Sequence, residues 1–366
     1  MLSIISIFRE IRDPRDFNAR HDVAAMLFIA LAATLCGAKS SVEIADFAAA
    51  NEEELATIVD LPHGSPSHDS FSRLFRLLDA VELAEVLGRF AQALRQALGL
   101  APAKGVVAID GKRLRRGYEK GRSCIPPLMV SVWDAETRLS LATRGAANGD
   151  EVAASLAALK SLDLKGCIVT GDALHCHPRM ATAVRERGAH YAIKLKANHG
   201  PLFSCAQAAF AAADAGGKLT FFECTDCSHD RQERRRASIV ARPADAPAFP
   251  DLAALGRIEA ERRGPDGKLS KTVHYVVLSK RLSPRRLIEV VRAHWTVENQ
   301  LHWRLDVVFN EDDARTRKNN APQNLAVVRR IALDILRAHP DKRSIARKMK
   351  LAAWKKEYFY ELFAYL

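Results

Sequence analysis

Residues 106–110 read Val-Val-Ala-Ile-Asp, and residues 168–172 read Ile-Val-Thr-Gly-Asp. Each is a short apolar run, rich in β-branched residues, that ends in an aspartate. Such a run is typical of a buried central strand, and the aspartate then lies at the carboxyl end of the strand, where open α/β sheets bind their ligands. We therefore expect Asp110 and Asp172 to meet at one edge of a sheet.

A third carboxylate, Glu298, lies in the helical segment of residues 294–303, which read HWTVENQLHW. At the same edge of the sheet it would complete an oxygen-rich site suited to Mg²⁺ or Mn²⁺, because hard cations prefer carboxylate ligands. The competing interpretation is that each aspartate only forms a turn or caps a helix, as aspartates after strands often do.

The pattern around the first two acids predicts a mixed α/β unit that follows a helical one. Apolar residues recur at helical spacing from residue 4 to about 98, with Ser65 or Ser67 as an N-cap, and residues 99–105 mark a boundary with Gly and Pro. Beyond the boundary we expect strands at 106–110, 127–134, 138–144, 167–171 and 191–195, and helices at 151–161 and about 179–187.

The segment between the second and third acids is long enough to hold an insertion. Residues 219–226, 235–241, 256–262 and 272–278 are strand-like and are separated by turn formers, which predicts antiparallel strands. Ser283 and Pro284 then provide an N-cap and a first-turn proline for the helix that carries Glu298, which we expect to run to about residue 307.

Four stretches closely resemble insertion-sequence transposases of the H-repeat-associated DDE type. They are VVAIDGKRLRRG from Val106, IVTGDALHCHPRMA from Ile168, YAIKLKANHGPL from Tyr191 and HWTVENQLHWRLDVVFNEDDARTR from His294. The resemblance covers nearly the whole chain. It implies a ribonuclease H-like α/β catalytic domain at 105–310 with an antiparallel β insertion at about 200–280. It also implies an all-helical N-terminal domain at 1–100, a candidate for binding DNA ends, and a basic helical C-terminal region at 311–366.

The resemblance also implies the chemistry. Asp110, Asp172 and Glu298 match the three acids of the DDE set, which would hold two Mg²⁺ or Mn²⁺ ions, cut double-stranded DNA at the terminal repeats of an element and join the ends to target DNA. Bringing two ends together suggests a homodimer. Two alternatives stay open: a plain metal-dependent nuclease, and a catalytically inactive, domesticated DNA-binding protein.

Around the acids lie the candidate DNA contacts. Basic residues follow the first strand and end the strand at 191–195, and at both places they could hold phosphates, although basic loops are often only solvated surface. Related transposases often carry a Tyr, an Arg and a Lys seven before, four before and seven after the catalytic Glu, where this chain has Val291, His294 and Leu305. The predicted DNA contacts are Lys112, Arg113, Arg115, Arg116, Lys194, Lys196, Asn198, His294, His302 and Arg304.

Three further patterns have ordinary interpretations that we prefer. His294, Glu298 and His302 recur every four residues and share a helix face, but the metalloprotease spacing is missing, so we expect the histidines to orient Glu298 or touch DNA rather than bind zinc. Trp295 and Trp303 are expected to pack in the core. The single Cys224-x-x-Cys227 motif near His229 is weak evidence for zinc.

Composition favours a globular protein with an anionic partner. The 366 residues carry a formal charge of +12, which fits nucleic acid but also an anionic surface, and 48% of residues are hydrophobic. The first hundred residues are net acidic, so we expect the basic surface late, between Arg315 and Lys356. No secretory signal is visible, the apolar run 23–38 is short for a membrane span, and seven scattered cysteines suggest free thiols, so we expect a cytoplasmic protein without membrane insertion.

Overall fold

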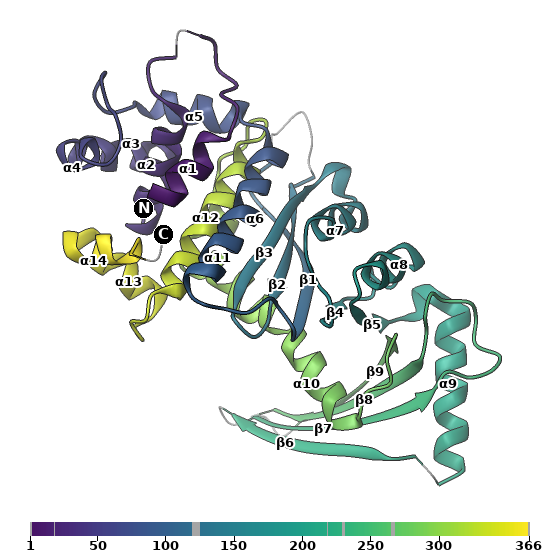
Figure 1. The fold of residues 1–366 in the computed structure, drawn as a ribbon. Coiled ribbons are helices and arrows are strands. Elements are labelled where there is room, and N and C mark those ends of the chain that lie inside the picture. Colours follow the sequence, from purple (N-terminus) through teal and green to yellow (C-terminus); the bar gives the residue numbers. More distant parts are fainter. Residues whose placement is uncertain are drawn as a thin grey trace.

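The computed structural model describes residues 2–17, 19–118, 125–217, 219–228, 231–264 and 268–364. The fold is mixed α/β, with many helices around one large twisted sheet (Figure 1). Among the helices described, none combines the length and the apolar composition needed to span a lipid bilayer.

Residues 2–97 contain helices joined by turns, and their described part contains no strand, as predicted. Ser67 caps α5 by accepting a hydrogen bond from the Ser70 amide, which settles the choice between the two serines in its favour. The helices of this segment are α1 (Leu2–Arg9), α2 (Val23–Leu35), α3 (Ser41–Ala50), α4 (Glu52–Ala56), α5 (His68–Leu77) and α6 (Ala80–Ala97).

The next segment has the predicted order of three strands, helix, strand, helix and strand. β1 pairs antiparallel with β2 and parallel with β4, and β4 pairs parallel with β5. The boundaries differ from the predicted ones by a few residues. The elements are β1 (Val106–Arg113), β2 (Leu128–Asp134), β3 (Leu139–Ala146), α7 (Glu151–Leu159), β4 (Ile168–Gly171), α8 (Pro178–Glu186) and β5 (His190–Leu195).

The four strands predicted between Asp172 and Glu298 are present and antiparallel. They extend the same sheet, because β9 pairs with β5, and the full strand order is β3-β2-β1-β4-β5-β9-β8-β7-β6. In Figure 1 the long strands project away from the helical part of the molecule, with α9 against one side. The elements are α9 (Gly200–Ala215), β6 (Phe221–Ser228), β7 (Arg231–Ala241), β8 (Ala254–Arg263) and β9 (Leu269–Leu278).

The helix that carries Glu298 is interrupted. α10 (Pro284–His294) begins at the predicted N-cap Ser283, which accepts a hydrogen bond from the Arg286 amide. A π-helix (Val297–His302) follows and then α11 (Trp303–Val307). The end at residue 307 is as predicted, but the π-helical turn at Glu298 was not, and such turns are frequent at functional sites.

The C-terminal helices return to the N-terminal ones. α12 (Ala321–Ala338), which is buried along most of its length, packs against α2, α5 and α6, and α13 (Ile345–Trp354) and α14 (Lys356–Leu362) lie beside it (Figure 1). One hydrophobic core joins both groups of helices to one face of the sheet through side chains such as Ala108 and Trp133. The opposite face, with Val107 and Ile109, packs beneath α7, α8 and α9.

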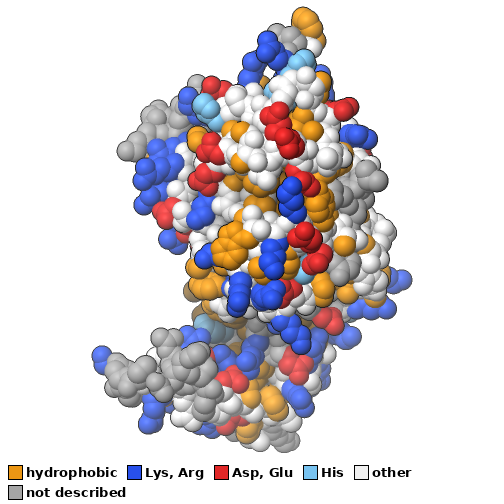
Figure 2. Space-filling view, turned by 90° about the vertical axis from the view of Figure 1, so that its left-hand side faces the viewer, with side chains coloured by type: hydrophobic (Ala, Val, Ile, Leu, Met, Phe, Trp, Pro, Cys, Tyr) orange, Lys and Arg blue, Asp and Glu red, His pale blue; other side chains and the backbone are white. Residues whose placement is uncertain are grey.

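The basic residues of the last segment do not all lie on the surface, where we expected them. Arg329, Arg330 and Lys348 are buried. Lys348 donates hydrogen bonds to the carbonyl oxygens of Leu336 and His339. On the face that carries α4, α13 and α14, Lys and Arg side chains alternate with Asp and Glu (Figure 2). Tertiary packing has therefore taken part of this charge into the interior.

Candidate active site

Asp110 and Asp172 lie side by side on neighbouring parallel strands. β1 and β4 pair with Ala108 opposite Thr170, so the two aspartates, each two residues further on, lie just beyond the last pair between these strands. The Asp110 side chain is only 14% exposed, whereas that of Asp172 is 47% exposed. The strand-end prediction is correct for Asp172, which follows β4, but wrong for Asp110, which lies inside β1 because the pairing with β2 continues to Arg113.

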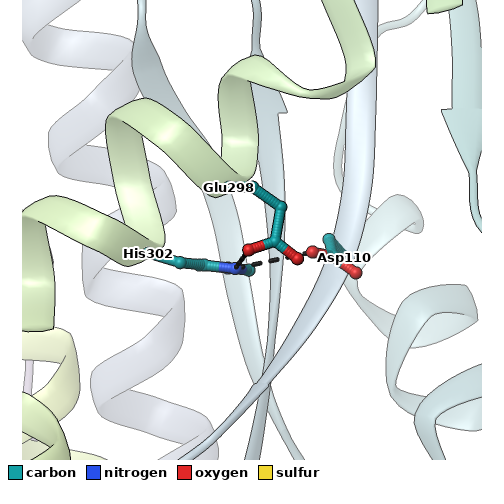
Figure 3. A group of neighbouring side chains, drawn as sticks. All are labelled: Asp110, Glu298 and His302. Atoms are coloured by element: carbon teal, nitrogen blue, oxygen red, sulfur yellow. Dashed lines mark ion pairs between the residues drawn. The ribbon is translucent and has the colours of Figure 1, made fainter. Parts of the chain in front are cut away.

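Glu298 approaches Asp110 from the π-helix (Figure 3). The side chains of Asp110, Glu298 and His302 point toward one another, and one ligand atom from each lies within 4.8 Å of the other two. His302 Nδ1 is 3.4 Å from Asp110 Oδ2 and 3.7 Å from Glu298 Oε2. Two carboxylates and an imidazole thus converge from elements that are almost 190 positions apart in the chain.

A cavity of about 190 Å³ opens beside the carboxylates and is lined by Asp110, Asp172 and Glu298. Its apolar wall comes from the inserted strands and α10, with Ile258, Val276 and Val291. Its polar rim includes Lys194, Lys196, His274 and His294. The cavity therefore combines carboxylates that can bind cations with lysines that can hold an anionic substrate.

The pKa values of Asp110 and Glu298 are shifted in opposite directions. Burial, and then the negative charges of Glu298, Glu151 and Asp172, raise the pKa of Asp110 to about 8. The pKa of Glu298 is lowered, mainly by its interaction with the His302 ring, whose effect outweighs that of burial. In the absence of a cation, Asp110 therefore keeps a proton near neutral pH.

Asp172 is held by His175, which no sequence argument singled out for this role. Burial acts to raise the pKa of Asp172, but hydrogen bonds from the His175 ring and from the amides of Leu174 and His175 lower it overall. His175 is fully buried, with Nδ1 2.8 Å from Asp172 Oδ1 and Nε2 3.0 Å from Ser155 Oγ. Asp172 is therefore presented to the cavity as a carboxylate in a fixed orientation.

A fourth acid, Glu151, lies behind the first two. It begins α7, its carboxylate is 3.8 Å from His175 Nε2, and the Gly111 amide donates a hydrogen bond to it. A Cβ at Gly111 would lie 2.5 Å from that carboxylate, so a larger residue beside Asp110 would displace the Glu151 side chain. No motif marks Glu151 in the sequence, because only the packing of α7 against the sheet brings it here.

The predicted DNA contacts separate into three groups. Lys194 is half-buried at the cavity, and burial, followed by the charge of Lys196, lowers its pKa. Lys196 and Asn198 are exposed nearby, and Asn198 also donates a hydrogen bond to the Ala173 carbonyl oxygen. These three residues lie on the rim of the site or next to it and remain candidates.

The second group follows β1. Arg113, Arg115 and Arg116 are exposed, and the latter two pair with Asp312 and Asp313. Lys112 differs, because its side chain is 8% exposed and its ammonium group lies 2.7 Å from both Asp306 and Asp312. This buried ion cluster ties β1 to the segment after α11, so the structure contradicts the expectation that Lys112 faces DNA.

The third group is on the Glu298 helix. His302 is 5% exposed and faces the acids, so it orients or joins them rather than contacting DNA. His294 is hydrogen-bonded to Thr170, and burial lowers its pKa to about 4, so it is neutral near pH 7. The guanidinium of Arg304 lies over the Trp303 ring.

The expectation that Trp295 and Trp303 pack in the core is wrong. They are 52% and 49% exposed. Trp295 follows the last residue of α10 and lines the cavity. Cys224 is a free, half-buried thiol, whereas the side chain of Cys227 and all of His229 lie outside the described residues.

Comparison with known families gives two matches that together cover most of the chain. Residues 101–335 match the model described as the transposase DDE domain, and residues 5–91 match the model described as DDE_Tnp_1-associated.

Similar proteins carry related names. The chain is 28% identical to the putative transposase YncI of Escherichia coli O157:H7, over all of this chain and 94% of that protein. It is 27% identical to the H repeat-associated putative transposase YhhI of Escherichia coli K12, over 99% of this chain and 96% of that protein. Among solved structures, a cryo-EM structure of a piggyBac transposase synaptic complex with hairpin DNA aligns with a TM-score of 0.47 and 12% identity, over 99% of this chain and 78% of that one.

Proposed function

Because the chain belongs to the family of transposases with a DDE domain, we propose that Asp110, Asp172 and Glu298 are its three catalytic acids. A DDE transposase is an enzyme that cuts DNA at the ends of a mobile element and transfers the cut strands to target DNA. The observation that supports the assignment is the convergence of these acids on one cavity from two neighbouring parallel strands and a distant helix. We further propose that residues 105–310 form a ribonuclease H-like domain, which agrees with the order of β1 to β5.

The acids fit divalent cations. Burial and three negative neighbours disfavour the ionised form of Asp110, and a bound cation would relieve that repulsion. Carboxylates are the ligands that Mg²⁺ and Mn²⁺ prefer. We propose two such ions, with Asp110 as a ligand to both, Asp172 as a ligand to one and Glu298 as a ligand to the other.

When bound, such ions would activate the attacking oxygen and stabilise the leaving oxygen, first for water at the element end and then for the freed 3′ hydroxyl at the target phosphate. The protein's part is to hold three ionised carboxylates in fixed positions. His175 and two backbone amides do this for Asp172. Asp110 is positioned by the backbone of β1 and by the close contact of Gly111 with Glu151.

We propose that Lys194 and Lys196 hold the phosphates next to the scissile one, since both line the cavity. Arg113, Arg115 and Arg116 would hold the backbone further along the duplex. The helical residues 1–100 remain our candidate for contacting the element ends, and residues 311–366 complete the helical core. Because two ends must meet during transposition, we propose that the active form is a homodimer.

The test is a cleavage and joining assay with the full chain and DNA that carries the candidate terminal repeats. With Mg²⁺ or Mn²⁺ we expect cuts at the repeat ends and joined products with target DNA, and neither with EDTA. Cleavage without joining would indicate a plain nuclease. DNA binding without metal-dependent cleavage would indicate an inactive DNA-binding protein. Either result would refute the proposal.

Metal affinity should depend on pH. With a pKa of about 8, Asp110 holds a proton below that pH, and a cation that binds there must displace it. We expect Mn²⁺ affinity to rise about tenfold per pH unit between pH 6 and pH 8 and to level off above. Calorimetric titration at four pH values measures this, and a flat profile would contradict the charge state assigned to Asp110.

Removing the buried partner of Asp172 should impair catalysis. We expect His175→Ala to lower the cleavage rate about 10- to 100-fold, the usual effect of losing a group that orients a metal ligand. His175→Asn, whose amide can donate to Asp172 from nearly the same position, should recover part of the rate. The test measures the cleavage rates and Mn²⁺ affinities of the two variants. Equal cleavage rates for His175→Ala and wild type would exclude a role for His175 in orienting Asp172.

A further inference from the structure

We propose that the ion between Asp110 and Glu298 has a third protein ligand, the Nδ1 nitrogen of His302, and that this position therefore prefers Mn²⁺ to Mg²⁺. The proposal rests on the function proposed above, because it adds a ligand to the same site. The three acids of the DDE set are all oxygen donors, so a nitrogen donor beside them changes which cation binds best.

The distances suit ligands that share an ion. Nδ1 lies 3.4 Å from Asp110 Oδ2 and 3.7 Å from Glu298 Oε2, longer than the roughly 2.7–2.9 Å of a hydrogen bond to a carboxylate. Two ligands with bonds of about 2.1 Å to one ion are separated by roughly 3.0–3.4 Å. Only a small contraction would bring the three atoms of Figure 3 into such a set.

His302 is built into this position. Its side chain is 7% exposed, and Leu301 and Leu305 of the same helical segment belong to the hydrophobic core. Nε2 is buried and has no hydrogen-bond partner among the described residues. Nδ1 faces the two carboxylates, and an imidazole placed in a core for packing alone would not need to face them.

The π-helical turn makes the arrangement possible. Glu298 and His302 are four residues apart and both lie in that turn, where wider winding lets both side chains approach Asp110. Two other histidines near the site have different partners, His294 with Thr170 and His175 with Asp172. His294 lines the same cavity and therefore serves as a matched control.

Nitrogen ligation predicts the preferred ion. Mg²⁺ favours oxygen ligands and keeps its waters, whereas imidazole suits transition-metal ions, which bind nitrogen-containing sites more tightly. We therefore expect the wild-type chain to bind Mn²⁺ at least about tenfold more tightly than Mg²⁺.

The test uses Mn²⁺ alone with the full chain, and its readout is the ¹⁴N modulation in electron spin-echo spectra of the bound ion. We expect imidazole modulation in wild type and in His294→Gln, and none in His302→Gln or His302→Asn. The Asn variant places an amide oxygen near the position of Nδ1, so Mg²⁺ binding should persist while the preference for Mn²⁺ falls about tenfold. Circular dichroism of each variant confirms that it is folded.

Two failures are distinguishable. If Mn²⁺ binds and Asp110→Asn weakens it, but no ¹⁴N modulation appears or it survives in both His302 variants, His302 is not a ligand and the carboxylate site stands. If Mn²⁺ binding is unaffected by Asp110→Asn, the metal site of the proposed function is itself refuted.

Discussion

Asp110→Asn is expected to abolish DNA cleavage and, in the metal-free protein, to raise stability. The cleavage rate should fall by about 10³-fold or more, because the substitution removes the ligand proposed to bind both ions. The same carboxylate is buried beside Glu298, Glu151 and Asp172, so neutralising it removes a repulsion from the folded state. Ala at Asp172 or Glu298 should also abolish cleavage, with the fold and DNA binding largely retained.

The sign of the stability effect follows from the direction of the pKa shift. The folded-state pKa of Asp110 is raised to about 8, above its ordinary value of 3.8, so ionisation costs stability progressively as pH rises between these values. Asp110→Asn should therefore change the free energy of unfolding little near pH 4 and increase it by roughly 1–3 kcal/mol at pH 8.5. Urea unfolding with EDTA at both pH values measures this.

Asp313→Asn is the matched control, because Asp313 is an exposed acid whose partner Arg116 is also exposed. Its effect on both cleavage and unfolding should be small. An Asp110→Asn protein that cleaves DNA within tenfold of the wild-type rate would refute the catalytic assignment. Equal stability of Asp110→Asn and wild type at pH 8.5 would refute the repulsion between Asp110 and its acidic neighbours.

Sequence patterns predicted those parts of the site that depend on local structure. The apolar runs before Asp110 and Asp172 favour strands whatever surrounds them, and Asp172 lies where its strand ends, whereas β1 continues for three residues beyond Asp110. Ser283 and Pro284 likewise fix the start of α10 through capping, which involves only neighbouring residues. Glu298 was already a candidate third acid from the sequence, and the family resemblance supported its place beside the aspartates, which no local pattern could fix.

Features that depend on distant partners escaped prediction. Glu151 and His175 reach the acids only because α7 and the loop after β4 pack together. Lys112 is buried because two aspartates about 200 positions away neutralise it. Trp295 is exposed because it lies at the cavity at the end of α10, which no sequence pattern indicated. In each case residue type predicted one environment and tertiary packing supplied another.

Glu311→Ala should give the largest loss of stability, about 3–5 kcal/mol in the free energy of unfolding. Glu311 is 1% exposed, and one of its carboxylate oxygens is 3.2 Å from Arg330 Nη1 and 3.8 Å from Arg329 Nη1. Arg330 is fully buried and Arg329 is 5% exposed. Removing the carboxylate leaves two guanidinium charges in the core without their counter-ion, a far larger cost than the loss of a surface ion pair.

This network also supports the active site. Arg330 Nε donates to Ser131 Oγ, and Ser131 lies directly opposite Asp110 in the pairing of β1 with β2. Glu311 follows the helical segment that holds Glu298 and His302, so the same carboxylate links that segment to α12 and the sheet. We therefore expect Glu311→Ala to weaken Mn²⁺ binding as well, although Glu311 does not line the cavity.

Two comparisons test whether the loss of stability in Glu311→Ala comes from unpaired buried charge rather than from lost packing. Asp313→Ala, two residues away and exposed, should cost less than about 1 kcal/mol. The double variant Glu311→Leu with Arg330→Met replaces the closer ion pair by apolar groups of similar size and leaves only the Arg329 charge without its counter-ion, so it should recover part of the lost stability. If the double variant is as unstable as Glu311→Ala, the cost arises from the shape of the core and not from an unpaired buried charge.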